Sequence, residues 1–540
     1  MTRFARSFPL LACSALALSA GLAQAQDAAA TATPIKHLIV IFQENVSFDH
    51  YFASYPKATN PAGEPAFHAA ADTPQNIDTL AHAGLLDTNP NAGAQNGADA
   101  AGPFRLDRTQ AGTADQNHGY TAEQAAFDHY KMDLFPKETG KGSKDGAGAF
   151  GTKGQVMGYY DGNTVTALWN YAQHYAMNDA SYSTTFGPST PGAINLVSGQ
   201  TNGAFLPPGY KLEKDGSYDG GRIVPDGQGG WTIISDFDPT GDVCSSKKYP
   251  TALMTGKNIG DMLNARGITW GWFEGGFDLT AKNADGSTGC DRTTTAPYIN
   301  VKSKDYIPHH EPFQYYPSTA NPEHIRPASV EAIGTSHDGG ANHQYDMTDW
   351  YAAMKANNLP AVSFLKASAY QDGHAGYSDP LDEQEFIAKV VNTVQDSPFW
   401  KDTAVVVLYD DSDGWYDHAH HLVNASNLPI KGYDVLTGDS CETGTPLPGV
   451  NGLPVQGRCG YGTRQPFLVI SPYAKVNYVD HTVTDQSSVM RFVEDNWLGG
   501  QRLGGGSFDA IAGSIDGMFD WAKPAAGKLI LDPATGEPKS

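Results

Sequence analysis

Two short apolar runs that end in polar residues place the strongest constraint on how this chain can fold. Residues 35–43 and 403–409 are rich in β-branched residues and too short for typical helices, so both are predicted to be buried strands. Strands that are apolar on both faces belong to a sheet that is covered on both sides. The residues that follow the two runs are Glu44, Asn45, Asp410 and Asp411.

The position of these four residues predicts a binding site. In open α/β sheets, ligands bind outside the carboxyl ends of the strands. Carboxylate and carboxamide oxygens are hard ligands that suit a divalent cation. Either strand end alone is equally well explained as the start of a solvated loop, but the repeated design favours a shared site.

The rest of the chain predicts one large α/β domain with a mainly parallel central sheet. Strand-like and helix-like segments alternate, which is typical of such sheets. No long Pro- or Ser-rich linker separates two complete sets, so we expect a single catalytic domain over residues 26–540. Further strands are expected at 267–274, 360–365 and 465–472, helices at 382–395 and 485–497, and insertions at about 56–112 and 203–255.

The first 25 residues have the form of a Sec-type signal peptide. Arg3 and Arg6 precede an apolar segment at 10–22, and residues 23–25 (Ala-Gln-Ala) form a small-x-small cleavage site. The apolar segment is shorter than the ~20 residues of a membrane-spanning helix, so no transmembrane segment is predicted. We therefore expect a periplasmic or secreted protein.

Four cysteines would remain after signal removal, an even set in an exported chain, so two disulfides are expected. Pairing of neighbours closes the shorter loops, although three connectivities are possible. A zinc site is disfavoured because no CxxC spacing is present. The neighbour pairs are Cys244 with Cys290 and Cys441 with Cys459.

The net charge of −23 limits the classes of partner. Nucleic-acid binding requires a basic face, and electrostatic docking to anionic membranes requires a basic patch. An anionic substrate would therefore need local positive charge from a metal ion, histidines or helix amino ends.

Ser189 and four histidines complete a predicted phosphoryl-transfer site. Ser189 lies just ahead of a predicted helix that has Pro191 in its first turn. A cation bound through the serine oxygen, together with the helix amino end, would favour the alkoxide. Each feature alone has an ordinary explanation, a helix cap or loop packing, but their combination favours catalysis. The histidines, which would contact phosphate oxygens and protonate the leaving group, are His118, His309, His310 and His374.

Four motifs resemble those of bacterial and plant phosphoesterases, which include non-specific phospholipases C and related acid phosphatases with an alkaline phosphatase-like fold. Residues 43–50 resemble the E-N-x-S-F-D-H signature, and residues 187–191 resemble the G-P-[ST]-x-P nucleophile motif. Residues 409–418 resemble the Y-D-E-x-x-G-x-x-D-H block, and residues 372–380 also match.

The resemblance implies a role for each matching position. Ser189 falls on the nucleophile that forms a phosphoenzyme, and Asp411 on a metal-ligand position usually occupied by Glu. The histidines fall on phosphate-binding and acid–base positions, and Asp417 and His418 on a block for which we expect a structural or supporting role. Oxygen donors favour Ca²⁺, Mg²⁺ or Mn²⁺ as the one divalent ion, while the relationship to zinc phosphatases keeps Zn²⁺ open. The implied metal ligands are Glu44, Asn45, Ser189, Asp410 and Asp411.

The predicted function is an exported, metal-dependent acid phosphatase that acts on small phosphate monoesters. Large phospholipases C of this family usually carry C-terminal β-rich modules, and none fits after the helix at 485–497. The alternative is a phospholipase C that cleaves phospholipid head groups. A third hypothesis is a non-catalytic surface-binding protein that uses the aromatic segment 270–277.

Overall fold

The computed structural model describes Met1 and residues 30–206, 222–226, 229–247, 250–421, 433–436, 455 and 457–539. The predicted signal peptide, apart from Met1, and Cys441 lie outside this part of the chain.

An eight-stranded sheet forms the centre of the molecule, with the order β14-β11-β15-β1-β16-β17-β4-β18. Seven strands run in one direction, and β17 runs against its neighbours β16 and β4. The prediction of a mainly parallel sheet in a mixed α/β fold is confirmed. The strands are β1 (His37–Gln43), β4 (Ala176–Asn178), β11 (Trp270–Glu274), β14 (Gln344–Asp346), β15 (Val362–Lys366), β16 (Thr403–Tyr409), β17 (Phe467–Ile470) and β18 (Tyr478–Asp480).

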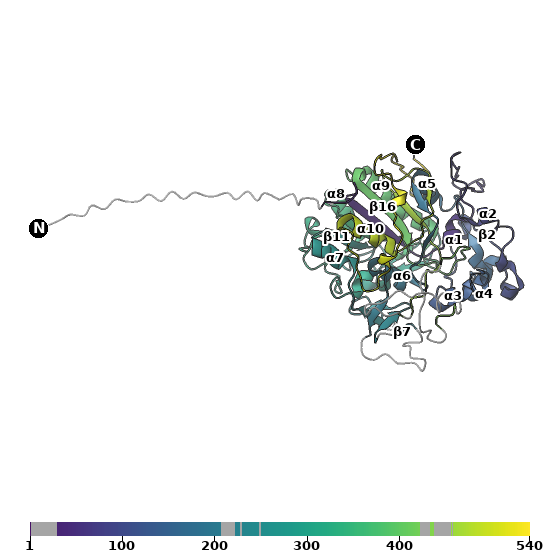
Figure 1. Ribbon diagram of the computed structural model, residues 1–540, viewed down its shortest axis with the longest axis horizontal. Helices are drawn as coiled ribbons and strands as arrows, with labels where there is room; N and C mark the ends of the chain where they lie inside the picture. The colour runs from purple at the N-terminus through teal and green to yellow at the C-terminus, as the bar shows by residue number, and fades with distance from the viewer. Residues whose placement is uncertain are drawn as a thin grey trace.

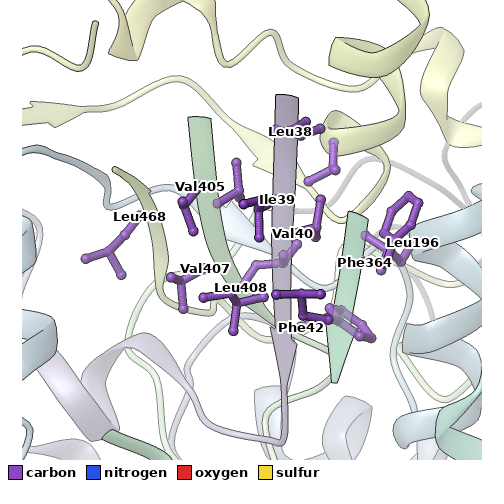
Figure 2. Packing of buried hydrophobic residues seen from close by; sticks show 14 of the residues in the cluster. Leu38, Ile39, Val40, Phe42, Leu196, Phe364, Val405, Val407, Leu408 and Leu468 are labelled. Carbon is purple, nitrogen blue, oxygen red and sulfur yellow. The ribbon is translucent and has the colours of Figure 1, made fainter. Parts of the chain in front are cut away.

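The two strands that the sequence singles out are neighbours at the middle of this sheet. They pair in parallel along their whole length, from His37 beside Thr403 to Gln43 beside Tyr409. Figure 2 shows the side chains of β1 packed between those of β16 and β15. The backbone N–H of Asp410 donates to the carbonyl of Gln43 over 3.1 Å, so both polar ends leave the sheet at the same edge.

Every residue of β1 from Leu38 to Gln43 is buried, so both faces of the central sheet are covered. The helices that pack together around it form two groups. One group consists of α5 (Thr166–His174) packed against α9 (Pro380–Asp396). In a second group, α6 (Ser189–Ser198) packs against α7 (Ile259–Arg266) and α10 (Ser487–Trp497). The helix α8 (Met347–Lys355) contacts the edge strand β14 and its neighbour β11 (Figure 1).

The predicted insertions are more regular than their composition indicates. The described parts of 203–255 contribute strands to a five-stranded sheet in the order β7-β8-β6-β10-β9, near the bottom of Figure 1. The segment 56–112, expected as a surface excursion, contains α2 (Leu80–Ala83) and β2 (Phe104–Arg105) and buries several apolar side chains. The strands of the small sheet are β6 (Asn202–Phe205), β7 (Ile223–Pro225), β8 (Trp231–Ile233), β9 (Asp238–Pro239) and β10 (Thr251–Met254).

The aromatic segment at 270–277 is not a binding surface, so this part of the third hypothesis is wrong. Trp270, Trp272 and Phe273 belong to the central strand β11, and each is fully buried. The burial of consecutive residues along β11 reflects packing on both faces of the sheet rather than exposure to a ligand.

A disulfide joins Cys244 and Cys290, whose Cα atoms lie 5.1 Å apart, as predicted. Cys459 is also disulfide-bonded. A search of the described helices finds none with the length and apolar character needed to cross a membrane.

Candidate active site

The polar residues after β1 and β16 meet the nucleophile candidate at the carboxyl edge of the sheet. Ser189 Oγ lies 3.1 Å from Glu44 Oε2 and 3.2 Å from Asp411 Oδ2. Ligand atoms of Glu44, Asp410 and Asp411 lie within 4.8 Å of one another, and all three side chains are buried. We call these three carboxylates, together with Asn45, the cradle.

The cradle holds more negative charge and more unpaired polar atoms than a buried site tolerates by itself. Among the described residues, neither amide atom of Asn45 nor Oδ2 of Asp410 has a hydrogen-bond partner. Burial and the nearby Glu44 carboxylate raise the pKa of Asp410 well above its usual value, and burial likewise raises the pKa of Asp411. A divalent cation would use the orphaned oxygens and offset the repulsion, so the donor set fits a hard metal ion.

A lysine that sequence reasoning missed contributes positive charge to the cradle. Lys366, the last residue of β15, is buried and forms an ion pair with Glu44 Oε1. Burial alone would raise the pKa of Glu44, but the nearby His310 and the charged Lys366 hold it well below its usual value. The two carboxylate oxygens of Glu44 have different partners: Oε1 faces Lys366, and Oε2 faces Ser189.

Ser189 occupies the first position of α6, with Pro188 as the residue before it. The amino end of a helix favours negative charge, which would suit the alkoxide expected if Ser189 is the nucleophile. Gly192, the fourth residue of α6, packs against the backbone of Asp410. A Cβ atom at Gly192 would stand 2.0 Å from the carbonyl oxygen of Asp410. A glycine is therefore required for this contact.

The four predicted histidines gather around the cradle in two pairs. His118 and His374 face each other with ring centroids 6.1 Å apart. His118 Nδ1 lies 3.0 Å from Asp413 Oδ1, while His374 Nδ1 contacts the carbonyl oxygen of Ala375 at 2.5 Å. Burial opposes the charge of His118, but Asp411 and Asp413 raise its pKa well above the usual value. Burial lowers the pKa of His374.

His309 and His310 lie together on the short 3-10 helix Pro308–His310, with ring centroids 4.6 Å apart. His309 Nδ1 is 3.4 Å from Asp238 Oδ1, and His310 Nδ1 is 3.2 Å from Glu44 Oε1. Burial opposes the charge of His309, but Asp238 outweighs it and raises the pKa. For His310, burial lowers the pKa well below its usual value.

Asp417 and His418 lie in a separate cluster, as the prediction of a supporting role implies. Arg464 is fully buried and donates to Asp417 Oδ1 over 3.1 Å and to Asp49 Oδ1 over 3.2 Å. His418 Nδ1 lies 2.6 Å from Asp49 Oδ2, and its Nε2 lies 3.2 Å from Asp78 Oδ1. We call this group the Arg464 cluster.

Comparison with known proteins places the chain among phosphoesterases. The model of the Phosphoesterase family matches residues 35–498. A non-hemolytic phospholipase C of Pseudomonas aeruginosa is 24% identical over 515 residues, which cover 91% of this chain and 58% of the relative. Phospholipase C A of Mycobacterium tuberculosis is 22% identical over 503 residues, covering 91% of this chain and 78% of the relative.

A plant protein, non-specific phospholipase C6 of Arabidopsis thaliana, is 28% identical over 138 residues, or 24% of this chain and 23% of its own length. The chain thus spans little more than half of the Pseudomonas relative's length. Since the family model covers most of the chain, including every residue of the cradle, the chain belongs to the Phosphoesterase family.

Proposed function

We propose that the chain hydrolyses phosphate monoesters through a phosphoserine intermediate on Ser189, with one divalent cation in the cradle. The observation that carries this proposal is the position of Ser189 Oγ, within hydrogen-bond distance of both Glu44 and Asp411 at the start of α6. The family assignment supports a hydrolase that acts on phosphoric ester bonds. The large, mostly parallel sheet is compatible with the alkaline phosphatase-like fold that the motifs predict.

Glu44, Asn45, Asp410, Asp411 and Ser189 would hold the cation. A bound divalent ion acts as a Lewis acid that stabilises the alkoxide and the charge on phosphate oxygens. The oxygen-rich ligand set favours Ca²⁺, Mg²⁺ or Mn²⁺, and Zn²⁺ remains a candidate.

The protein's own groups account for the remaining steps. Ser189 Oγ attacks phosphorus, and the bond from phosphorus to the leaving oxygen breaks. The leaving oxygen takes a proton from an imidazolium; His118 and His309 fit this role because each has a carboxylate partner. Water then gives a proton to the imidazole that protonated the leaving group and attacks phosphorus; the bond from phosphorus to Ser189 Oγ breaks, which restores the serine oxygen and releases inorganic phosphate.

His310, whose Nδ1 lies 3.2 Å from Glu44 Oε1, and His374 would contact phosphate oxygens. Lys366 keeps Glu44 ionised, so that this carboxylate can face both the cation and Ser189. Such preorganised groups typically contribute about 10²–10³-fold each to the rate of group transfer.

Cleavage of phospholipid head groups is the second candidate, favoured by the names of the relatives, which are phospholipases C. Both activities would use Ser189 as the nucleophile. The residues around the opening of the active site would determine whether a small monoester or a phospholipid is cleaved. Expression without residues 1–25 would give protein for parallel assays on p-nitrophenyl phosphate and on phosphatidylcholine vesicles.

Faster turnover of the monoester would support the phosphatase, and lipid cleavage with negligible monoester hydrolysis would overturn that choice. Ser189→Ala should abolish both activities and leave folding intact, because the substitution removes only the hydroxyl group of a buried side chain. Ser471→Ala, which removes a buried hydroxyl bonded to the carbonyl of Thr403, serves as the matched control with retained activity. Near wild-type hydrolysis by Ser189→Ala would contradict the nucleophile assignment.

A further inference from the structure

We propose that Glu123 is a positioning residue that holds the segment carrying Ser189 and the segment carrying Asp411 at a fixed distance. This inference rests on the proposed function, since it assigns Glu123 to the same site. Glu123 lies outside the four motifs that the sequence analysis identifies, and no step of the mechanism above uses it.

Glu123 lies in the helix α3 (Tyr120–Phe127), and its side chain is buried with 2% exposure. Oε2 accepts a hydrogen bond from the backbone N–H of Gly187 over 2.9 Å. Oε1 accepts a hydrogen bond from the hydroxyl of Ser412 over 2.6 Å. One carboxylate therefore contacts two segments that are more than 200 residues apart in the chain.

Each of these contacts is adjacent to a group that takes part in the proposed chemistry. Gly187 lies two residues before Ser189 and has a φ of +118°, a conformation that side chains other than hydrogen rarely adopt. Ser412 follows Asp411 directly, and its Oγ also accepts the N–H of Gly414 over 3.0 Å.

The distance between Ser189 Oγ and Asp411 Oδ2, 3.2 Å, is set by the relative placement of these two segments. A shift of about 1 Å in such a distance is enough to lower a rate by about 10²-fold. Because Glu123 does not contact the reacting atoms, its effect should appear in turnover rather than in substrate binding.

The test is Glu123→Ala, assayed with p-nitrophenyl phosphate and a saturating divalent cation. The substitution removes both hydrogen bonds, so kcat should fall by about 10²-fold while KM stays within about twofold. Glu123→Gln should restore kcat to within about threefold of wild type, because its amide oxygen can accept from Gly187 and its amide N–H can donate to Ser412.

A matched control separates positioning from a general loss of stability. Glu494 is another fully buried glutamate, and it accepts the N–H of Leu503 over 2.9 Å and an Arg502 N–H over 3.1 Å. Glu494→Ala should lower the melting temperature and leave kcat unchanged. If kcat falls equally in both alanine variants, or falls less than about twofold in Glu123→Ala, the inference is overturned.

Should Glu123→Ala fail to fold, Ser412→Ala decides the question, because it removes one of the two contacts and leaves Glu123 bonded to Gly187. A fall in kcat at unchanged KM supports the inference, and wild-type kcat overturns it. Failure of the proposed function can be distinguished from failure of this inference. It would appear as retained hydrolysis in Ser189→Ala, independently of the result for the Glu123 variants.

Discussion

The cradle and the Arg464 cluster take most of their carboxylates from the same two sequence segments, but they differ in how far neighbouring groups balance the negative charge. Residues 44–50 supply Glu44 to the cradle and Asp49 to the Arg464 cluster. Residues 409–418 likewise supply Asp411 to one and Asp417 to the other. Both groups are buried, so the burial of an acid alone does not distinguish them.

Compensation of charge distinguishes the two groups. In the Arg464 cluster, a guanidinium and an imidazole contact the carboxylates directly. In the cradle, Lys366 and His310 both lie against Glu44, while oxygens of Asn45 and Asp410 stay without partners among the described residues. Buried polar groups without partners are costly, so an uncompensated cluster indicates a ligand and a compensated one indicates structure.

The largest expected effect comes from Asp410→Asn. This change removes one cradle carboxylate, so we expect activity to fall by about 10³-fold. In protein freed of cations by chelation, the same change should leave the melting temperature unchanged or higher, because it relieves repulsion.

Asp417→Asn is the matched control in the other cluster, where the opposite outcome is expected. It weakens a partner of Arg464, so stability should fall while kcat of the folded enzyme persists. Activity measurements and thermal melts with and without EDTA would check both variants, and the same pattern at both positions would refute the contrast.

Arg464→Met should have the next largest effect. Removing one partner of a buried ion pair leaves uncompensated carboxylates, which costs about 3–5 kcal/mol of unfolding free energy. Urea unfolding would measure this loss. A variant as stable as the wild type would show that the Arg464 cluster is not a structural support.

The smallest expected effect is pH-dependent and concerns His418→Gln. Burial opposes the charge of His418, but Asp49 and Asp78 raise its pKa to about 10, while Arg464 acts against them. A raised pKa stabilises the fold fully below the unfolded value of about 6.5, and this stabilisation is lost as the pH rises through about 10.

His418→Gln should therefore cost about 2 kcal/mol at pH 6, as for a hydrogen bond to a charged group, and progressively less toward pH 10. Denaturant unfolding of both proteins at several pH values would measure the difference. A penalty that is constant with pH would show that the imidazole is not charged in the fold.

The centre of the site could be predicted from sequence because its signals are local. A strand that is apolar on both faces and ends in acids predicts both a covered sheet and a candidate site at its carboxyl edge, as Glu44 and Asp410 illustrate. Two of the motifs contain Ser189 and His374, and the structure places Ser189 beside Glu44 and His374 beside His118.

The partners of these residues could not be predicted, because they depend on long-range pairing. Lys366 ends a strand, where a lysine usually reaches solvent; the register of β15 beside β1 is what brings it to Glu44. Asp238, which pairs with His309, comes from the small sheet in a segment expected as an insertion. Arg464 has no motif signal, and its role follows from contacts to residues far away in sequence.

The close contact of Gly192 with the carbonyl oxygen of Asp410 has a consequence for how enzymes of this design can diverge. Because α6 touches the backbone of the neighbouring strand end there, any residue larger than glycine at position 192 would clash with the carbonyl oxygen of Asp410 and push the start of α6 away from that strand. If the proposed site is the reaction centre, we expect substrate preference to vary through the surrounding loops, because a substitution at this contact would displace Ser189.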